Sequence, residues 1–303
     1  MKIVAYSPVH EQAWNQFVQD HPQGWFFHTR WFLDYLAVGA EDYSFLFMEN
    51  DRICGIFPLV LRDGKSVDGY PLPMTLIKIY GELDDFDLQP CLDILKNAKA
   101  KDLDIRDSPL AETMDGRWEL LNPIKPHQSI VVDLSLPERE RWLDIRKSYR
   151  PLITKAKRNY HILIPVQNWF EPFMTMHEEE RGGATRSLAT WEAMREWVAD
   201  GVATVFGARN KQSQTWAAFI LIVEYKNKAY YAVSAAKEND ITAWMLWEIQ
   251  QYLAERGVEE FEIGWTSMAK NAKEANIEFF KRGICSRLKP WCSVQMIGNG
   301  EKL

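Results

Sequence analysis

The chain has 303 residues, of which 47% are hydrophobic and 26% are charged. Disordered chains contain fewer apolar residues and collagen-like chains many more glycines, so this composition indicates a globular protein with one large or two ordinary domains. The formal net charge of −6 excludes a globally basic nucleic-acid binder, although it is compatible with a local basic patch.

No apolar run approaches the roughly 18–20 residues of a membrane-spanning helix, and the first residues lack the apolar core of a signal peptide. The four cysteines and six histidines show no metal-ligand spacing. Glycine-rich phosphate loops and the G-x-S-x-G nucleophile elbow are also absent from the sequence. We therefore expect a cytoplasmic protein with reduced cysteines, no membrane span, no metal, no tightly bound cofactor and no DNA partner.

The first half of the chain alternates helical and strand patterns. Apolar residues on most turns predict a helix over 25–38, and apolar runs on either side of a polar turn predict a pair of strands. The remaining expected elements are an amphipathic helix and two short strands. The strands are expected over 44–49, 53–61, 102–105 and 129–134, and the amphipathic helix over 86–101.

The segment over 137–157 is basic, and Arg139–Arg158 carries eight Lys or Arg against two Asp or Glu. Pro151 is expected to break it into two helices, because a proline ring clashes with the preceding helical turn. Such a segment is either a solvated helix pair between domains or a surface that faces phosphate groups. In the second case Arg150, Lys155 and Arg158 would engage an anionic substrate.

The second half has a regular element order: a helix, three strands joined by polar turns, a helix, a strand, a helix and a strand. These elements are expected over 188–201, 202–209, 215–225, 229–235, 241–256, 259–264, 269–282 and 288–297. This is the order of the GCN5-related N-acetyltransferase (GNAT) fold, in which a meander and a βαβ crossover form a mixed sheet.

The first half has the pattern of a degraded copy of the second, which indicates internal duplication. We therefore predict an α/β (α+β) protein of two tandem GNAT-like domains, each a mixed, largely antiparallel sheet flanked by helices. The N-terminal domain is expected over 1–135. The C-terminal domain is expected over 136–303, with the basic helical segment over 136–160 at its start.

Several segments together resemble the FemAB-type, or Fem-like, acyltransferases, which are tandem GNAT-fold proteins. The resemblance covers nearly the whole chain and depends on the order of the segments. They are Gln23–Trp31 (QGWFFHTRW), Ile145–Lys157 (IRKSYRPLITKAK), the block over 202–264 and Asn276–Gly283 (NIEFFKRG). The last is similar to the family's "FK-x-G-F-G" segment, with Ile284 and Cys285 in place of Phe and Gly.

The resemblance implies an acyltransferase that acts in cell-envelope biogenesis. Family members transfer an amino acid from aminoacyl-tRNA to peptidoglycan precursors, and relatives acetylate surface glycans. Phe280 and Lys281 would then lie at the reaction centre. When an amine attacks an ester or thioester, negative charge develops on the carbonyl oxygen, and a fixed cation stabilises it. Alternatively, Lys281 complements the dipole at the C-terminus of its helix.

Other residues are candidates for substrate binding. In the first half these are His28, Arg30 and Trp31, and in the basic segment Arg150. His177 and Arg181 precede the Gly182–Gly183 hinge, where an arginine would hold a carboxylate or phosphate. Three more residues lie at the ends of predicted strands, where GNAT enzymes bind the acyl group and where clefts open. They are Tyr231, Ser234 and Trp265.

The acyl donor and the acceptor stay open at the level of sequence. The segment Glu238–Trp247 lacks the glycines with which acetyl-CoA enzymes cradle a pyrophosphate, which disfavours acyl-CoA. The acidic total charge disfavours aminoacyl-tRNA, for which the basic segment is the available surface. Tyr35 occupies the place of a lysine that contacts nucleotide-linked muramyl peptide in some relatives, so the acceptor is a glycan or peptide precursor of unspecified kind. The alternative function is a non-catalytic binding protein that holds an anionic glycan or nucleotide-sugar on a decayed transferase scaffold.

Overall fold

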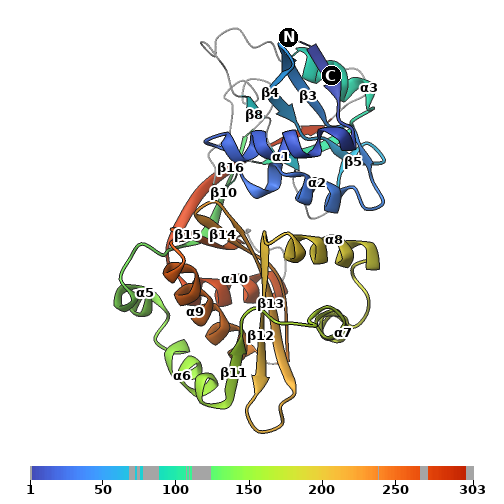
Figure 1. Cartoon of the computed structure of the whole chain (residues 1–303). Coiled ribbons are helices and arrows are strands. Elements are labelled where there is room, and N and C mark those ends of the chain that lie inside the picture. Colours follow the sequence, from blue (N-terminus) through green and yellow to red (C-terminus); the bar gives the residue numbers. More distant parts are fainter. Residues whose placement is uncertain are drawn as a thin grey trace. The chain divides into compact units, whose positions relative to one another are not determined.

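The computed structural model describes residues 2–67, 72–73, 76–77, 89–106, 108, 110, 124–237, 239–266 and 272–297. The chain divides into two compact units (Figure 1). Unit 1 comprises Met1–His127 and Pro290–Leu303, and unit 2 comprises Gln128–Lys289. These ranges differ from the expected 1–135 and 136–303 because the chain crosses between the units within strands. β10 (Ile124–Asp133) begins in unit 1, and β16 (Leu288–Ile297) begins in unit 2.

Unit 1 contains an antiparallel sheet of order β1-β3-β4-β8. The hairpin of β3 and β4 turns at Asn50 and Asp51, both with positive φ, as the sequence predicts for this turn. β16 pairs with β9, and β9 in turn pairs with β6 and β7. The strand bounds are β1 (Lys2–Ala5), β2 (Glu41–Asp42), β3 (Phe45–Glu49), β4 (Arg52–Phe57), β5 (Val60–Arg62), β6 (Lys65–Ser66), β7 (Leu72–Pro73), β8 (Leu76–Ile77) and β9 (Asp102–Arg106).

The prediction of a helix over 25–38 is wrong for the residues before Arg30. Residues Phe26–His28 form a short 3₁₀ helix, and α2 (Arg30–Leu36) begins only after Thr29, whose backbone is extended. The Thr29 hydroxyl donates a hydrogen bond to the Phe26 carbonyl at 2.6 Å, which closes this turn in place of a continuing helix. Unit 1 also contains α1 (Glu11–Asp20), which the sequence patterns did not indicate, and α3 (Gln89–Asn97).

Unit 2 is built on a mixed sheet of order β11-β12-β13-β14-β15-β10. β12, β13 and β14 form the predicted antiparallel meander, and β15 pairs with β14 in parallel after the helix α9 (Asn239–Glu255). The strand bounds are β11 (Tyr160–Leu163), β12 (Ala203–Asn210), β13 (Trp216–Tyr225), β14 (Lys228–Ala236) and β15 (Glu260–Thr266). The predicted mixed sheet is therefore confirmed.

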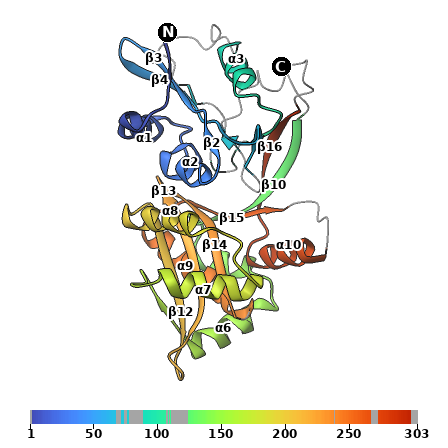
Figure 2. The ribbon, with the colours of Figure 1, turned by 90° about the vertical axis from the view of Figure 1, so that its right-hand side faces the viewer.

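Helices cover both faces of the unit 2 sheet. Residues of α6 (Tyr149–Asn159) and α9 form one core cluster with Ile220 of β13 and Phe261 of β15. α7 (Phe170–Arg181) and α8 (Leu188–Ala199) lie on the other side of the sheet in both views (Figures 1 and 2), where α7 contacts β13 and β14 and α8 contacts β12. α10 (Ala272–Ile284) packs against β15 and α9. Within the described part of the chain, no helix is long and apolar enough to cross a membrane.

The basic segment forms two helices, α5 (Glu138–Asp144) and α6, as expected, but Pro151 does not separate them. The break falls over 145–148, and Pro151 occupies the third position of α6. A proline is tolerated in the first turn because the backbone N–H groups there have no partner within the helix. The break instead follows the extended backbone of Ile145, which ends α5.

Candidate functional site

Lys281 lies near the C-terminal end of α10 with its side chain half-buried. Its Nζ atom lies against the backbone of Gly264 on β15, so closely that a Cβ atom at residue 264 would overlap it. Gly264 has a φ of +117°, which residues other than glycine rarely adopt. The neighbouring register shift leaves Ile263 unpaired with β10 and forms a bulge at this point. Among the described residues, Lys281 has no hydrogen-bond or ion-pair partner.

Phe280 and Gly283 fix this part of α10 against the segment that precedes α6. The Phe280 ring packs on the core cluster, with its centroid 6.0 Å from that of Tyr149. A Cβ atom at Gly283 would overlap the Tyr149 ring, and the Gly283 carbonyl accepts a hydrogen bond from the Arg146 N–H at 2.9 Å. The Ile145–Lys157 and Asn276–Gly283 segments of the sequence are thus in direct contact, and this contact positions Lys281.

The buried carboxylate of Glu262 interacts electrostatically with this lysine and was missed by the sequence analysis. Glu262 is 5% exposed and lies on β15, two residues before Gly264. Burial raises its pKa to about 7, against the hydrogen bond from Ser129 and the positive charges of Lys281 and Lys289. Burial lowers the pKa of Lys281, and the charge of Glu262 opposes this effect. The alternation of Phe261, Glu262 and Ile263 was the available signal, but it is equally typical of a strand with one face in water.

A second group of candidate residues lies where α7 meets β14. The Tyr231 hydroxyl donates a 2.5 Å hydrogen bond to Ser234 Oγ, and burial raises the pKa of Tyr231 to about 12. Glu180 and Arg181, at the end of α7, both act on the Tyr231 hydroxyl through their charges. The Glu180 carboxylate also accepts a hydrogen bond from the Ala236 N–H at 3.0 Å. The structure therefore brings Tyr231 and Ser234 together and places the charge of Arg181 near them, and their role in binding stays a prediction.

His177 belongs to the same group but is 1% exposed. Its Nε2 atom lies 2.8 Å from Arg186 Nη1, and because a guanidinium only donates, the histidine nitrogen is the acceptor. Burial lowers the pKa of His177 to about 4, and the charges of Arg186 and Arg181 add to this effect. His177 is therefore neutral at neutral pH and orients Arg186, while Arg181 is exposed and available to a ligand.

Solved structures with similar folds cover nearly the whole chain. FemX matches with a TM-score of 0.71 and 14% identity over 99% of this chain and 98% of its own. L-PGS from Bacillus licheniformis matches with a TM-score of 0.58 and 11% identity over 96% of this chain and 92% of its own. A tandem GNAT protein from the clavulanic acid biosynthesis pathway matches with a TM-score of 0.53 and 9% identity, over 98% of each chain.

The chain has the FemAB-like tandem GNAT fold. No protein-family model and no curated protein sequence matches the chain. The likeness therefore establishes the fold, and the roles of individual residues depend on the geometry of this chain.

In the first GNAT-like half, His28 and Arg30 are buried. His28 is enclosed in the 3₁₀ turn, where its Nδ1 atom accepts a hydrogen bond from the Trp25 N–H at 3.3 Å. Arg30 is 1% exposed, forms ion pairs with Asp34 and with Asp42 (2.6 Å), and lies 3.6 Å from the centroid of the Tyr6 ring. Trp31 is half-buried beside them. These contacts favour a structural role for Arg30 over contact with an acceptor.

Replacing Arg30 by Lys tests this role. A lysine retains the charge but not the planar guanidinium that stacks on the Tyr6 ring and reaches both carboxylates through Nη2, so we expect the free energy of unfolding to fall by about 2 kcal/mol. Denaturant titration measures the change, and Arg52→Lys, at an exposed position of β4, is the matched control with an expected effect below about 0.5 kcal/mol. Unchanged stability in Arg30→Lys would instead indicate a guanidinium held for a ligand.

The two other candidates in the second half have different environments. Arg150 donates hydrogen bonds to the carbonyls of Leu143 (2.6 Å) and Ile145 (3.0 Å), and so completes the C-terminal turn of α5. Its guanidinium is therefore engaged in holding the two basic helices together. Trp265 is 39% exposed on β15, directly after Gly264, and so presents an aromatic surface to solvent.

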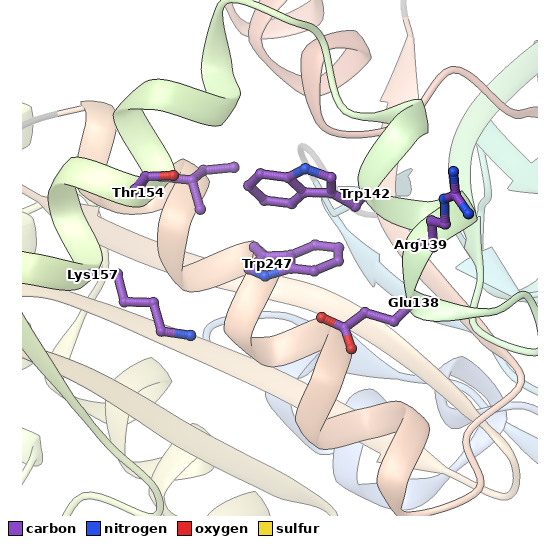
Figure 3. A pocket seen from close by; sticks show the side chains of 7 residues that line it. Glu138, Arg139, Trp142, Thr154, Lys157 and Trp247 are labelled. Atoms are coloured by element: carbon purple, nitrogen blue, oxygen red, sulfur yellow. The ribbon is translucent and has the colours of Figure 1, made fainter.

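A cavity of about 400 Å³ lies among α5, α6 and α9 (Figure 3). Its lining contains Trp142 and Trp247, whose ring centroids are 4.9 Å apart, and Lys157, which forms an ion pair with Glu248 at 3.2 Å. Trp247 is 6% exposed and therefore offers little ring surface to a ligand. None of the predicted site residues lines this cavity. Among the residues that the structure describes, no His, Cys, Asp and Glu group is arranged to hold a metal ion.

Proposed function

We propose that this protein is a FemAB/GNAT-type acyltransferase that transfers an acyl or aminoacyl group to an amine of a cell-envelope peptide or glycan precursor in the cytoplasm. The observation that carries the proposal is the Lys281 ammonium, which is half-buried, lies against Gly264 and has no hydrogen-bond or ion-pair partner among the described residues. In a tandem GNAT fold, a cation held in this way is suited to an oxyanion and needs no serine or cysteine nucleophile.

The reaction that we propose is a direct transfer. The acceptor amine attacks the carbonyl carbon of the donor, a C–N bond forms, and the carbonyl oxygen becomes negatively charged beside the Lys281 ammonium. When the tetrahedral intermediate collapses, the ester C–O or thioester C–S bond breaks, and the leaving group gains the proton that the amine loses. Phe280 packs Lys281 into place, and Trp265, Tyr231, Ser234, His177 and Arg181 are proposed to contact or orient the substrates. No oxidant or reductant is needed.

The structure favours an aminoacyl ester over acyl-CoA as the donor. α9 begins at Asn239 and carries Asp240 in its first turn. A carboxylate there competes with a phosphate group for the helix N-terminus. In contrast, α5, α6 and the link between them expose cations suited to a tRNA backbone. They are Arg139, Lys147, Lys155, Lys157 and Arg158.

Two binding measurements test the donor. We expect uncharged and charged tRNA to bind with an affinity that falls steeply between about 50 and 200 mM salt, and the double variant Lys155→Glu/Arg158→Glu to weaken binding roughly tenfold at the lower salt concentration. Arg195→Glu, on exposed α8 on the other side of the sheet, is the matched control and should leave the affinity nearly unchanged.

Thermal melting with acetyl-CoA and longer acyl-CoAs should be flat. A ligand at about 100 times its dissociation constant adds roughly 2.7 kcal/mol to the stability, which is a shift of several degrees. A clear shift with an acyl-CoA would identify that donor instead. If neither tRNA nor any acyl-CoA binds, the proposed transferase function is wrong.

A further inference from the structure

The carboxylate of Glu262 is buried where a negative charge is energetically unfavourable. It is 5% exposed, between Phe261 and Ile263, which are fully buried and belong to the core cluster of unit 2. Ser129 donates a hydrogen bond to it, but its Oε2 atom is buried without a hydrogen-bond partner among the described residues. An unpaired buried carboxylate costs several kcal/mol unless a nearby cation compensates for it. A nearby positive charge would therefore stabilise the ionised form of Glu262.

Three of the described cations near β15 lie beside Glu260. Lys289 Nζ lies 3.1 Å from both Glu260 carboxylate oxygens, and Arg287 and Lys228 lie 3.8 and 4.0 Å from the same group. Arg287 is also paired with Asp133 at 2.7 Å. Lys281 has no ion pair within the described residues, and its charge acts on Glu262 more strongly than that of Lys289, which is paired with Glu260.

We propose that Glu262 is a positioning residue whose buried carboxylate favours the charged ammonium form of Lys281 beside Gly264. Glu262 acts through Lys281 and does not touch the substrate, because its side chain is buried. The catalytic meaning of this pair rests on the proposed function, since an oxyanion is stabilised by an ammonium and not by a neutral amine.

The charges that surround Lys281 support this assignment. Burial lowers the pKa of Lys281, and Glu262 is the charge that raises it. Several other charged groups that the structure describes on or beside α10 have contacts of their own: Arg282 lies 2.8 Å from Glu278, Arg146 lies over the Phe279 ring at 3.7 Å, and Asp144 accepts a hydrogen bond from Ser286. Removing the Glu262 charge leaves burial unopposed, so the pKa of Lys281 must fall.

The test measures the titration of Lys281 directly in the full chain. Lysines are reductively methylated with ¹³C, which retains their charge, and the Lys281 signal is assigned by its absence in Lys281→Met. In Glu262→Gln we expect the Lys281 midpoint to fall by about one pH unit or more. Glu260→Gln is the matched control on the same strand, and it should leave the midpoint unchanged. Glu262→Asp, which retains the charge, should restore most of the wild-type value.

An unchanged midpoint in folded Glu262→Gln, or an equal shift in Glu260→Gln, would overturn the inference. If Glu262→Gln does not fold, Glu262→Asp is compared with a neutral variant that does fold, such as Glu262→Ala. Identical Lys281 titration midpoints in these two variants would contradict the inference. The titration needs neither donor nor acceptor, so its failure is distinct from a failure of the proposed function. Where transfer is measurable, the alkaline limb of the pH–rate profile in Glu262→Gln should move to lower pH, with the rate preserved at lower pH.

Discussion

Lys281→Met is expected to lower the turnover of acyl transfer by about 10²- to 10³-fold, which is the usual effect of removing one oxyanion donor. Methionine retains most of the length and the apolar stem of lysine, so Phe280 and Gly283 should keep α10 in place against Tyr149. The loss should fall on kcat rather than KM, because the charge that Lys281 meets exists mainly in the transition state.

The control must separate this loss from a change in folding. Arg282→Met, at the next position of α10, removes an exposed cation that pairs with Glu278, and should leave turnover unchanged. In Lys281→Met, Glu262 loses its compensating charge, so its pKa rises further above that of an unfolded chain. A carboxyl group with a raised pKa contributes stability at low pH that is lost as the pH rises through the folded pKa. The melting temperature of Lys281→Met should therefore lie below that of the wild type mainly at about pH 8, and much less at about pH 6.

Retained turnover in a folded Lys281→Met protein would contradict the catalytic assignment. If the variant loses turnover but still binds tRNA or acyl-CoA as the wild type does, the role of Lys281 is chemical. A wild-type protein that binds these ligands without any turnover would correspond to the binding-protein alternative. The two outcomes differ in kcat and not in affinity, so both measurements are needed.

The fold of unit 2 could be predicted because its local patterns agree with its tertiary contacts. The runs at Trp216–Tyr225 and Lys228–Ala236 alternate or stay apolar around polar turns, and the spacing in α9 is that of an amphipathic helix. α7 was missed because its apolar residues are interrupted by Pro172 and by the acidic residues over 178–180. Its place is fixed by packing on β13 and β14, which the sequence does not show.

Two helix boundaries were misjudged because a glycine and a proline were interpreted by local rules alone. The helix expected over 269–282 continues through Gly283 to Ile284. The glycine is required there for the close approach of the Tyr149 ring, not for a left-handed turn. Pro151 was expected to break the basic helix, yet it occupies the first turn of α6. In both cases the residue type was informative, but Gly283 is explained by a contact far away in the sequence and Pro151 by its place in the first turn of a helix.

The candidate site was only partly predictable for a similar reason. Lys281 was identified through a motif resemblance, and it lies in the last turn of α10. Glu262 was invisible because a glutamate in an alternating strand normally faces water. Arg30 belongs to a motif that indicated substrate binding, yet two aspartates and Tyr6 surround it. Burial and pairing decide the role of a charged side chain, and neither is encoded in its local pattern.

Gly264→Ala should reproduce much of the Lys281 defect without changing the lysine. A methyl group at this position overlaps Nζ, and because a lysine side chain is flexible, the ammonium will move away from β15 rather than unfold α10. We expect turnover to fall by about 10²-fold, since a displacement of about 1 Å at a reacting group has this effect. The positive φ of +117° adds a backbone cost of about 1–3 kcal/mol.

Gly257→Ala separates the two effects of that substitution. Gly257 also has a positive φ, of +78°, but no atom lies within 4 Å of a Cβ built there. It should therefore lose a similar amount of stability in a denaturant titration while it retains its turnover. Full turnover in Gly264→Ala, or an equal loss in Gly257→Ala, would contradict the placement of the Lys281 ammonium. If Gly264→Ala alone is impaired, and its Lys281 no longer responds to Glu262→Gln in the ¹³C titration, then the bulge on β15 positions the cation against both the carboxylate and the reacting carbonyl oxygen.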